Sequence, residues 1–118
     1  MNEYTQSSSF LFPFELSEEK VIDMLNTISK HDKLQIKFEI IKSKNRTEKI
    51  SGEIYEKDRL SNPAYFFINS IKDGKSFNRI NFETIPGYKT QESRIYEFKL
   101  WKRIISDIEK YLKNKKIL

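Results

Sequence analysis

Hydrophobic and polar residues alternate along the middle of the chain, with the two-residue period of a β-strand. Apolar side chains occupy every second position in residues 34–40 and again in residues 50–54, where a glycine takes one of the places. Residues 65–68 are apolar at every position, which favours a central strand partly covered on both faces, and residues 77–82 alternate again. The pattern therefore predicts four strands, and their short connections favour antiparallel pairing.

A period of three to four residues, typical of amphipathic helices, flanks the strand region on both sides. The first predicted helix covers residues 18–30 and follows Ser17, which is a good N-cap. The second predicted helix covers residues 93–113, and its apolar positions form one stripe: Ile95, Phe98, Trp101, Ile105, Ile108 and Leu112. Because Tyr96 and Phe98 also alternate with polar residues, a fifth strand over residues 94–98 is the alternative for the start of this segment.

The N-terminal residues 1–16 are predicted to form an arm, and residues 17–118 a single domain. The arm is polar up to residue 9 and then has an apolar cluster around Pro13, which we expect to pack against the domain. A short edge strand and an exposed segment for a partner are the alternatives. The predicted fold is α+β, in the order α-β-β-β-β-α, with a four-stranded, mostly antiparallel sheet and both helices packed on one face.

Composition removes several function classes. The 118 residues contain no Cys, one His and three Gly, so thiolate zinc sites, thiol enzymes and glycine-rich phosphate loops are excluded. We therefore expect no catalytic residues, no metal and no cofactor, and a protein that is not an enzyme. No apolar run reaches the roughly 18 residues that a membrane span needs, and no signal-peptide pattern precedes the domain. A cytoplasmic protein without membrane contact is the expectation.

Aromatic residues are numerous for one sheet face, with nine Phe, six Tyr and one Trp. Three of them, Tyr55, Tyr65 and Phe67, are predicted to lie on the sheet face away from the helices. With Phe10 and Phe12 of the arm they could form a protein-binding surface, in an inhibitor, an immunity-type protein or an adaptor. A homodimer interface and a second small core are the other interpretations. A protein-binding module is the first functional hypothesis.

The charge is uneven and supports a second hypothesis. The chain has 22 Lys and Arg against 17 Asp and Glu, a net charge of +5. Projected at 100° per residue, five cations of the last helix fall within an arc of roughly 100°. They are Lys99, Lys102, Arg103, Lys110 and Lys113. Such a face could contact nucleic-acid phosphates without regard to sequence, so nucleic acid is the alternative partner.

A third hypothesis comes from one short motif. Glu97-Phe98-Lys99 is an E-x-K sequence with Asp73 upstream, and it resembles half of the motif of PD-(D/E)xK nucleases. The resemblance implies that an acidic pair holds Mg²⁺ while the lysine positions the attacking water. It covers only residues 73–101. Asp73 stands in an Asp-Gly turn, which departs from the family pattern, so this hypothesis ranks below the other two.

Overall fold

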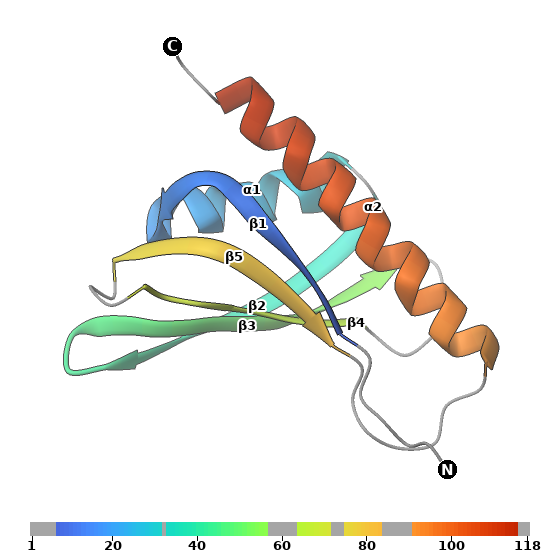
Figure 1. Cartoon of the computed structure of the whole chain (residues 1–118), viewed down its shortest axis with the longest axis horizontal. Helices are drawn as coiled ribbons and strands as arrows, with labels where there is room; N and C mark the ends of the chain where they lie inside the picture. Colours follow the sequence, from blue (N-terminus) through green and yellow to red (C-terminus); the bar gives the residue numbers. More distant parts are fainter. Residues whose placement is uncertain (1–6, 32, 57–63, 72–74, 84–90, 116–118) are drawn as a thin grey trace.

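The computed structural model describes residues 7–31, 33–56, 64–71, 75–83 and 91–115. Within these ranges the chain is one α+β domain (Figure 1). Its elements in chain order are β1 (Ser7–Ser17), α1 (Glu18–His31), β2 (Leu34–Ser43), β3 (Arg46–Glu56), β4 (Ala64–Asn69), β5 (Ser76–Glu83) and α2 (Gln91–Lys115).

The sheet has five strands in the order β1-β5-β4-β3-β2, and every neighbouring pair is antiparallel. The prediction of antiparallel pairing is confirmed, and the prediction of four strands is wrong. The additional strand is β1, built from most of the segment expected to be an arm. It takes the edge beside β5, where Phe10 stands opposite Ile80 and Leu16 opposite Phe77.

Strand β1 is bent, and Pro13 lies at the bend. Leu11 pairs with Arg79, and Leu16 pairs with Phe77. Four residues of β1 therefore lie opposite a single residue of β5, Asn78. A bulge of this kind curves an edge strand, and proline is tolerated there because it has no amide hydrogen to donate. The arch of β1 is visible in Figure 1. The edge strand that was an alternative for this segment is therefore confirmed, and the proline and the irregular register explain why the periodicity did not favour it.

The connections follow local sequence chemistry. Lys44 and Asn45 have φ of 49° and 70°, the left-handed values that a two-residue hairpin turn between β2 and β3 requires. This confirms the polar turn expected between the first two predicted strands. The Asp-Gly turn expected after β4 lies outside the described residues. At the start of α1, the amide of Lys20 donates to Ser17 Oγ at 3.2 Å, so the predicted N-cap is also confirmed.

Helix α2 is continuous through residues 94–98, so the alternative strand there is wrong. Its buried stripe is rotated relative to the prediction. Ile95 is 47% exposed, whereas the buried positions of the helix are Glu97, Leu100, Trp101, Ile104, Ile108, Tyr111 and Leu112. The helical period is satisfied by these residues without Ile95, and the alternation of Tyr96 and Phe98 reflects the partly buried borders of the stripe.

One hydrophobic core joins the sheet to both helices. It contains Val21 and Leu25 from α1, Trp101 and Ile104 from α2, and the inward residues of all five strands. The Trp101 ring stacks on Phe82 of β5 with centroids 5.9 Å apart. The Tyr111 hydroxyl of α2 donates a hydrogen bond to the Asp23 carboxylate of α1. In Figure 1 α1 lies above β2 and β3, and α2 runs diagonally from the top of the view to the lower right.

Gly52 stands at a close approach between neighbouring strands. It lies on β3 opposite Phe38 of β2 and Phe66 of β4. A Cβ at this position would come within 2.2 Å of the Lys37 carbonyl oxygen and 2.9 Å of Phe66 Cζ. Glycine is therefore required here because the Phe66 ring crosses the β3 backbone where a side chain would otherwise be.

Candidate protein-interaction face

The alternation of side chains divides the sheet into two faces with different surroundings. On β4, Ala64, Phe66 and Ile68 are buried in the core, while Tyr65 and Phe67 between them are only half-buried. Strand β3 has the same division, with Ile50 and Ile54 buried in the core. The face that carries Tyr65 and Phe67 is called the open face below.

Strand register arranges the open face in three rows that run across the strands. The first row contains Lys37, Glu53, Tyr65 and Glu83. The middle row contains Glu39, Ser51, Phe67, Asn81 and Ser9. The third row lies two residues from the middle row on each strand. It consists of Ile41, Lys49 and Asn69, paired across β2, β3 and β4, and of Arg79 and Leu11, paired across β5 and β1. Tyr55, opposite Gln35, extends the face beyond the first row.

Polar contacts hold the aromatic side chains of this face in place. Lys49 Nζ lies 5.0 Å from the centre of the Phe67 ring, and Lys37 Nζ lies 5.4 Å from that of Tyr55. The Tyr55 hydroxyl donates to Glu53 Oε2 at 2.6 Å. That hydrogen bond, followed by partial desolvation, raises the pKa of Tyr55 above its ordinary value. The lysines cover the rings through cation–π contacts and their aliphatic stems.

The centre of the open face is hollowed. A shallow depression of about 480 Å³ is lined by residues of the first two rows and by Lys49 of the third. Phe38, Gly52 and Phe66, which lie between these positions along their strands, also line it. A second depression of about 320 Å³ is lined by Ser9 and Asn81, among others. Phe67 and Glu83 line both depressions, so the two adjoin each other. The two depressions place Phe67 at the middle of a concave strip that crosses the sheet.

Exposed hydrophobic residues concentrate at the edges of the same face. Among the described residues three large hydrophobic side chains are exposed, and two of them, Leu11 at 55% and Ile41 at 41%, belong to the third row. Together with Tyr65 and Phe67 they give the open face apolar groups on three of its five strands, β1, β2 and β4. Apolar groups gathered on one face in this way are typical of a protein contact surface.

Three of the five residues proposed from the sequence for protein binding lie together here, namely Tyr55, Tyr65 and Phe67. The other two face the core. Phe12 is 4% exposed and Phe10 packs against the same core cluster, with ring centroids 6.2 Å apart. Leu11 and Ile41 were missed. Leu11 could have been found from its position between Phe10 and Phe12, because alternate residues of a strand face opposite sides.

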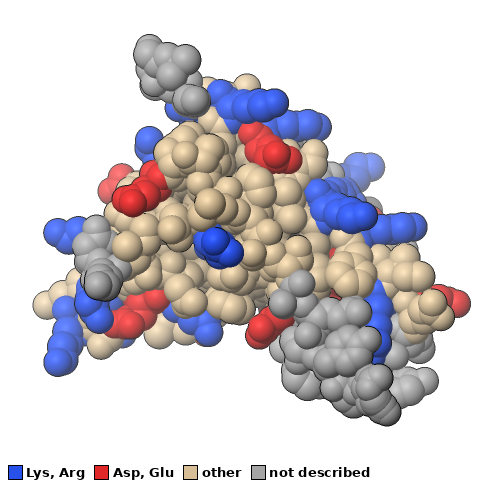
Figure 2. Space-filling view, in the orientation of Figure 1, with Lys and Arg blue, Asp and Glu red and all other residues tan. Residues whose placement is uncertain are grey.

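The five cations proposed for nucleic acid all lie on α2. Lys99, Lys102, Lys110 and Lys113 are exposed, and Arg103 is partly buried. In Figure 2 blue Lys and Arg side chains follow the course of α2 across the molecule. Arg103 differs from the others because its Nη1 lies 3.3 Å from Glu56 Oε2 at the end of β3. The charge of Arg103 is therefore partly balanced within the chain.

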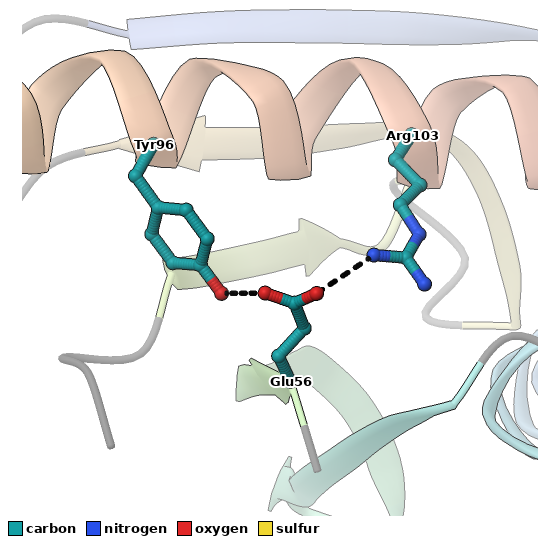
Figure 3. A network of polar contacts seen from close by, with 3 residues as sticks. All are labelled: Glu56, Tyr96 and Arg103. Carbon is teal, nitrogen blue, oxygen red and sulfur yellow. Dashed lines mark hydrogen bonds and ion pairs between the residues drawn. The ribbon is translucent and has the colours of Figure 1, made fainter. Parts of the chain in front are cut away.

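Glu56 links β3 to α2 through two contacts (Figure 3). The Tyr96 hydroxyl donates to Glu56 Oε1 at 2.5 Å, and Arg103 pairs with the other carboxylate oxygen. A hollow of about 360 Å³ adjoins this network and is also lined by Ile95, Lys99 and Leu100. Each carboxylate oxygen of Glu56 has a partner on α2, so the network serves to position the helix against the sheet.

The side chains of the E-x-K motif, Glu97 and Lys99, point to opposite sides of α2. Glu97 is 1% exposed and Lys99 is exposed. Two residues apart on an α-helix, side chains project about 200° from each other, whereas the resemblance implies one shared strand face. Asp73 lies outside the described residues. Among the residues that the structure describes, no group of three His, Cys, Asp or Glu side chains is placed to hold a metal ion.

Comparison of the chain with models of protein families and with curated protein sequences finds no match. In the described part of the chain, neither helix combines the length and apolar character that crossing a membrane requires. Inference about function therefore rests on the surfaces of this molecule.

Proposed function

We propose that the chain is a non-enzymatic protein-binding module in which both helices pack on one face of the sheet and the open face receives the partner. The observation that supports this most is the half-buried pair Tyr65 and Phe67 at the centre of the concave strip. Aromatic residues at the centre of a contact surface, with polar residues around them, are the usual composition of a protein interface.

The charges of the open face favour protein over nucleic acid at this site. Its rows contain three cations, Lys37, Lys49 and Arg79, and three anions, Glu39, Glu53 and Glu83. A face without net positive charge has little attraction for a phosphate backbone, which requires an excess of Lys and Arg. Interspersed charges of both signs instead give orientation and selectivity to a protein contact.

The test replaces the two central aromatics while the core is kept. The variant Tyr65→Ser with Phe67→Ser should lose a bound protein that the unmodified chain retains after nuclease treatment and at high salt. The matched control, Lys102→Glu with Lys110→Glu on α2, should retain it. Affinity capture followed by mass spectrometry measures both. Equal recovery with the sheet variant and the unmodified chain would contradict the proposal.

A second candidate function is nucleic-acid binding by α2. The specific observation is that Lys99, Lys102, Lys110 and Lys113 are all exposed along about 21 Å of one helix. Binding of a labelled oligonucleotide should weaken as salt rises, and it should weaken further with Lys102→Glu and Lys110→Glu. Lys30→Glu on α1 is the control for a lost surface cation. Affinity that is unchanged in the α2 variant would remove this candidate.

A further inference from the structure

We propose that the partner of the open face is a second copy of this chain, related by a twofold axis that runs along the middle row. This inference rests on the proposed function, because it uses the same face. It is carried by the distribution of charge between the first and third rows. The first row has two anions, Glu53 and Glu83, with the cation Lys37 at its β2 end, and the third row has two cations, Lys49 and Arg79.

The two pairs of opposite charges are placed symmetrically about the middle row. On β3, Glu53 and Lys49 are each two residues from Ser51, on opposite sides of it. On β5, Glu83 and Arg79 are each two residues from Asn81. Two residues of a strand span about 6.6 Å, so each charge stands that far from the middle row along its strand.

A twofold axis in the plane of the interface, along the middle row, turns this arrangement into complementarity. The rotation places the first row of one copy over the third row of the other and leaves each strand facing its own counterpart. Glu53 then faces Lys49 of the second copy, and Glu83 faces Arg79 of the second copy. Each contact occurs twice, as an isologous interface requires.

The same rotation brings the apolar centre of the face onto itself. Phe67 lies on the middle row, so its ring faces the Phe67 ring of the second copy across the concave strip. Tyr65 faces Asn69, and Ile41 faces the aliphatic stem of Lys37. An aromatic centre surrounded by charged pairs is the arrangement in which a few central residues supply most of the binding free energy.

One residue opposes the association and therefore gives a test of opposite sign. Glu39 lies on the middle row at the β2 side, and the rotation places it opposite Glu39 of the second copy. Like charges that face each other weaken a contact. Glu39→Gln should therefore tighten the dimer by about two- to fivefold, a change of a size expected for one solvent-exposed charge pair.

The decisive experiment exchanges charges between copies and measures sedimentation equilibrium of the full chain. Lys49→Glu places two anions against each other, and Glu53→Lys places two cations against each other. Each variant alone should therefore self-associate about tenfold more weakly than the unmodified chain, or not at all. An equimolar mixture of the two variants restores both oppositely charged contacts and should form a heterodimer. A purely structural role of either residue predicts no such recovery.

Two further measurements keep the outcome decisive. Circular dichroism checks that each variant is folded, and where either variant unfolds, the pair Arg79→Glu and Glu83→Arg replaces it in the same mixing design. Dimerisation of the unmodified chain that both single variants abolish and the mixture restores supports the proposal. A monomer at high concentration, a dimer insensitive to these charges, or a mixture that stays monomeric overturns it.

The dimer and the general function fail in different ways. A monomeric chain that still captures another protein through Tyr65 and Phe67 overturns the dimer and leaves the proposed function standing. If the chain is a monomer and substitution of those two residues does not change the capture of another protein, both the dimer and the proposed function are overturned. A dimer that responds to Lys49 and Glu53 as described supports both.

Discussion

The two faces of the sheet are built from the same alternating pattern and from similar residues, yet their surroundings differ completely. Phe66 and Phe82 lie in the hydrophobic core and are at most 2% exposed. Their neighbours Tyr65 and Phe67 face the other side, where lysine side chains give the only ring contacts described. Alternation assigns successive residues to opposite sides of the sheet. The first set shares one hydrophobic core with residues of α1 and α2, and the second set is not part of that core.

This difference separates stability from association. Burial of an aromatic side chain against helices contributes several kcal/mol to the free energy of folding, because the ring is removed from water and makes close contacts. A half-buried ring on the open face contributes less in the single chain and has surface left to lose to a partner. Substitutions on the covered side should therefore act on unfolding, and those on the open face on association.

The largest effect is expected at Trp101 on the covered side. Its indole is 1% exposed and contacts two other rings, Phe82 at 5.9 Å and Phe98 at 5.0 Å between centroids. Trp101→Ala should lower the free energy of unfolding by about 3–5 kcal/mol, since it leaves a cavity in the core. Urea denaturation measures this change. A loss below about 1 kcal/mol would mean that α2 does not bury this side chain.

Gly52 gives the next largest effect, through crowding rather than a cavity. Gly52→Ala would place a methyl group 2.2 Å from the Lys37 carbonyl oxygen, so β2 and β3 must separate locally. The expected loss in the free energy of unfolding is about 1–3 kcal/mol. Ser51→Ala, one residue away on the open face, is the matched control and should change stability by less than about 0.5 kcal/mol. Equal losses would place the crowding elsewhere.

Much of the fold could be predicted from local patterns. The N-cap at Ser17 and the polar hairpin turn near Lys44 depend on chemistry within a few residues, so the sequence is sufficient to find them. The aromatic residues of the open face also followed from local alternation. Because Phe66 and its neighbours on β4 are apolar at every position, the pattern indicated that both sides of this strand carry large side chains.

What could not be predicted depends on contacts between distant segments. Strand β1 was only an alternative in the prediction, because Pro13 interrupts its period. Its pairing with β5 and the burial of Phe12 show that the segment belongs to the sheet and the core. The three rows of the open face depend on the register between strands. Glu53 of β3, for example, stands opposite Tyr65 of β4, although residues 57–63 separate the two strands in the sequence. Local propensity carries no information on that register, which is set by the tertiary packing of the covered side.

A third prediction concerns pH and tests the helix pair on the covered side. Burial, and then the hydrogen bond donated to Asp23, raises the pKa of Tyr111 to about 12. An unfolded chain releases this proton near pH 10, so the folded state binds more protons between about pH 10 and 12. The stabilisation is therefore complete below pH 10 and is lost as the pH rises to about 12.

Tyr111→Phe isolates this contribution. The free energy of unfolding of the unmodified chain should fall by about 1–2 kcal/mol more than that of the variant between about pH 9 and pH 11.5. Urea denaturation at the two pH values measures the difference. Parallel losses in the two proteins would show that the Tyr111–Asp23 contact does not join α2 to α1 in solution.

The smallest effect on stability, at Phe67, tests the contrast between the faces most directly, because Phe66 beside it is the matched control. Phe66→Ala should cost about 3–5 kcal/mol, whereas Phe67→Ala should cost about 1 kcal/mol, since the second ring is only half-buried in the single chain. Both are measured by urea denaturation at a concentration that keeps the chain monomeric, because self-association adds stability. As the concentration rises, the unmodified chain and Phe66→Ala should gain stability and Phe67→Ala should not. Equal costs for the two rings at low concentration would mean that the open face is covered within one chain, and its aromatics would then form a second core rather than a binding surface.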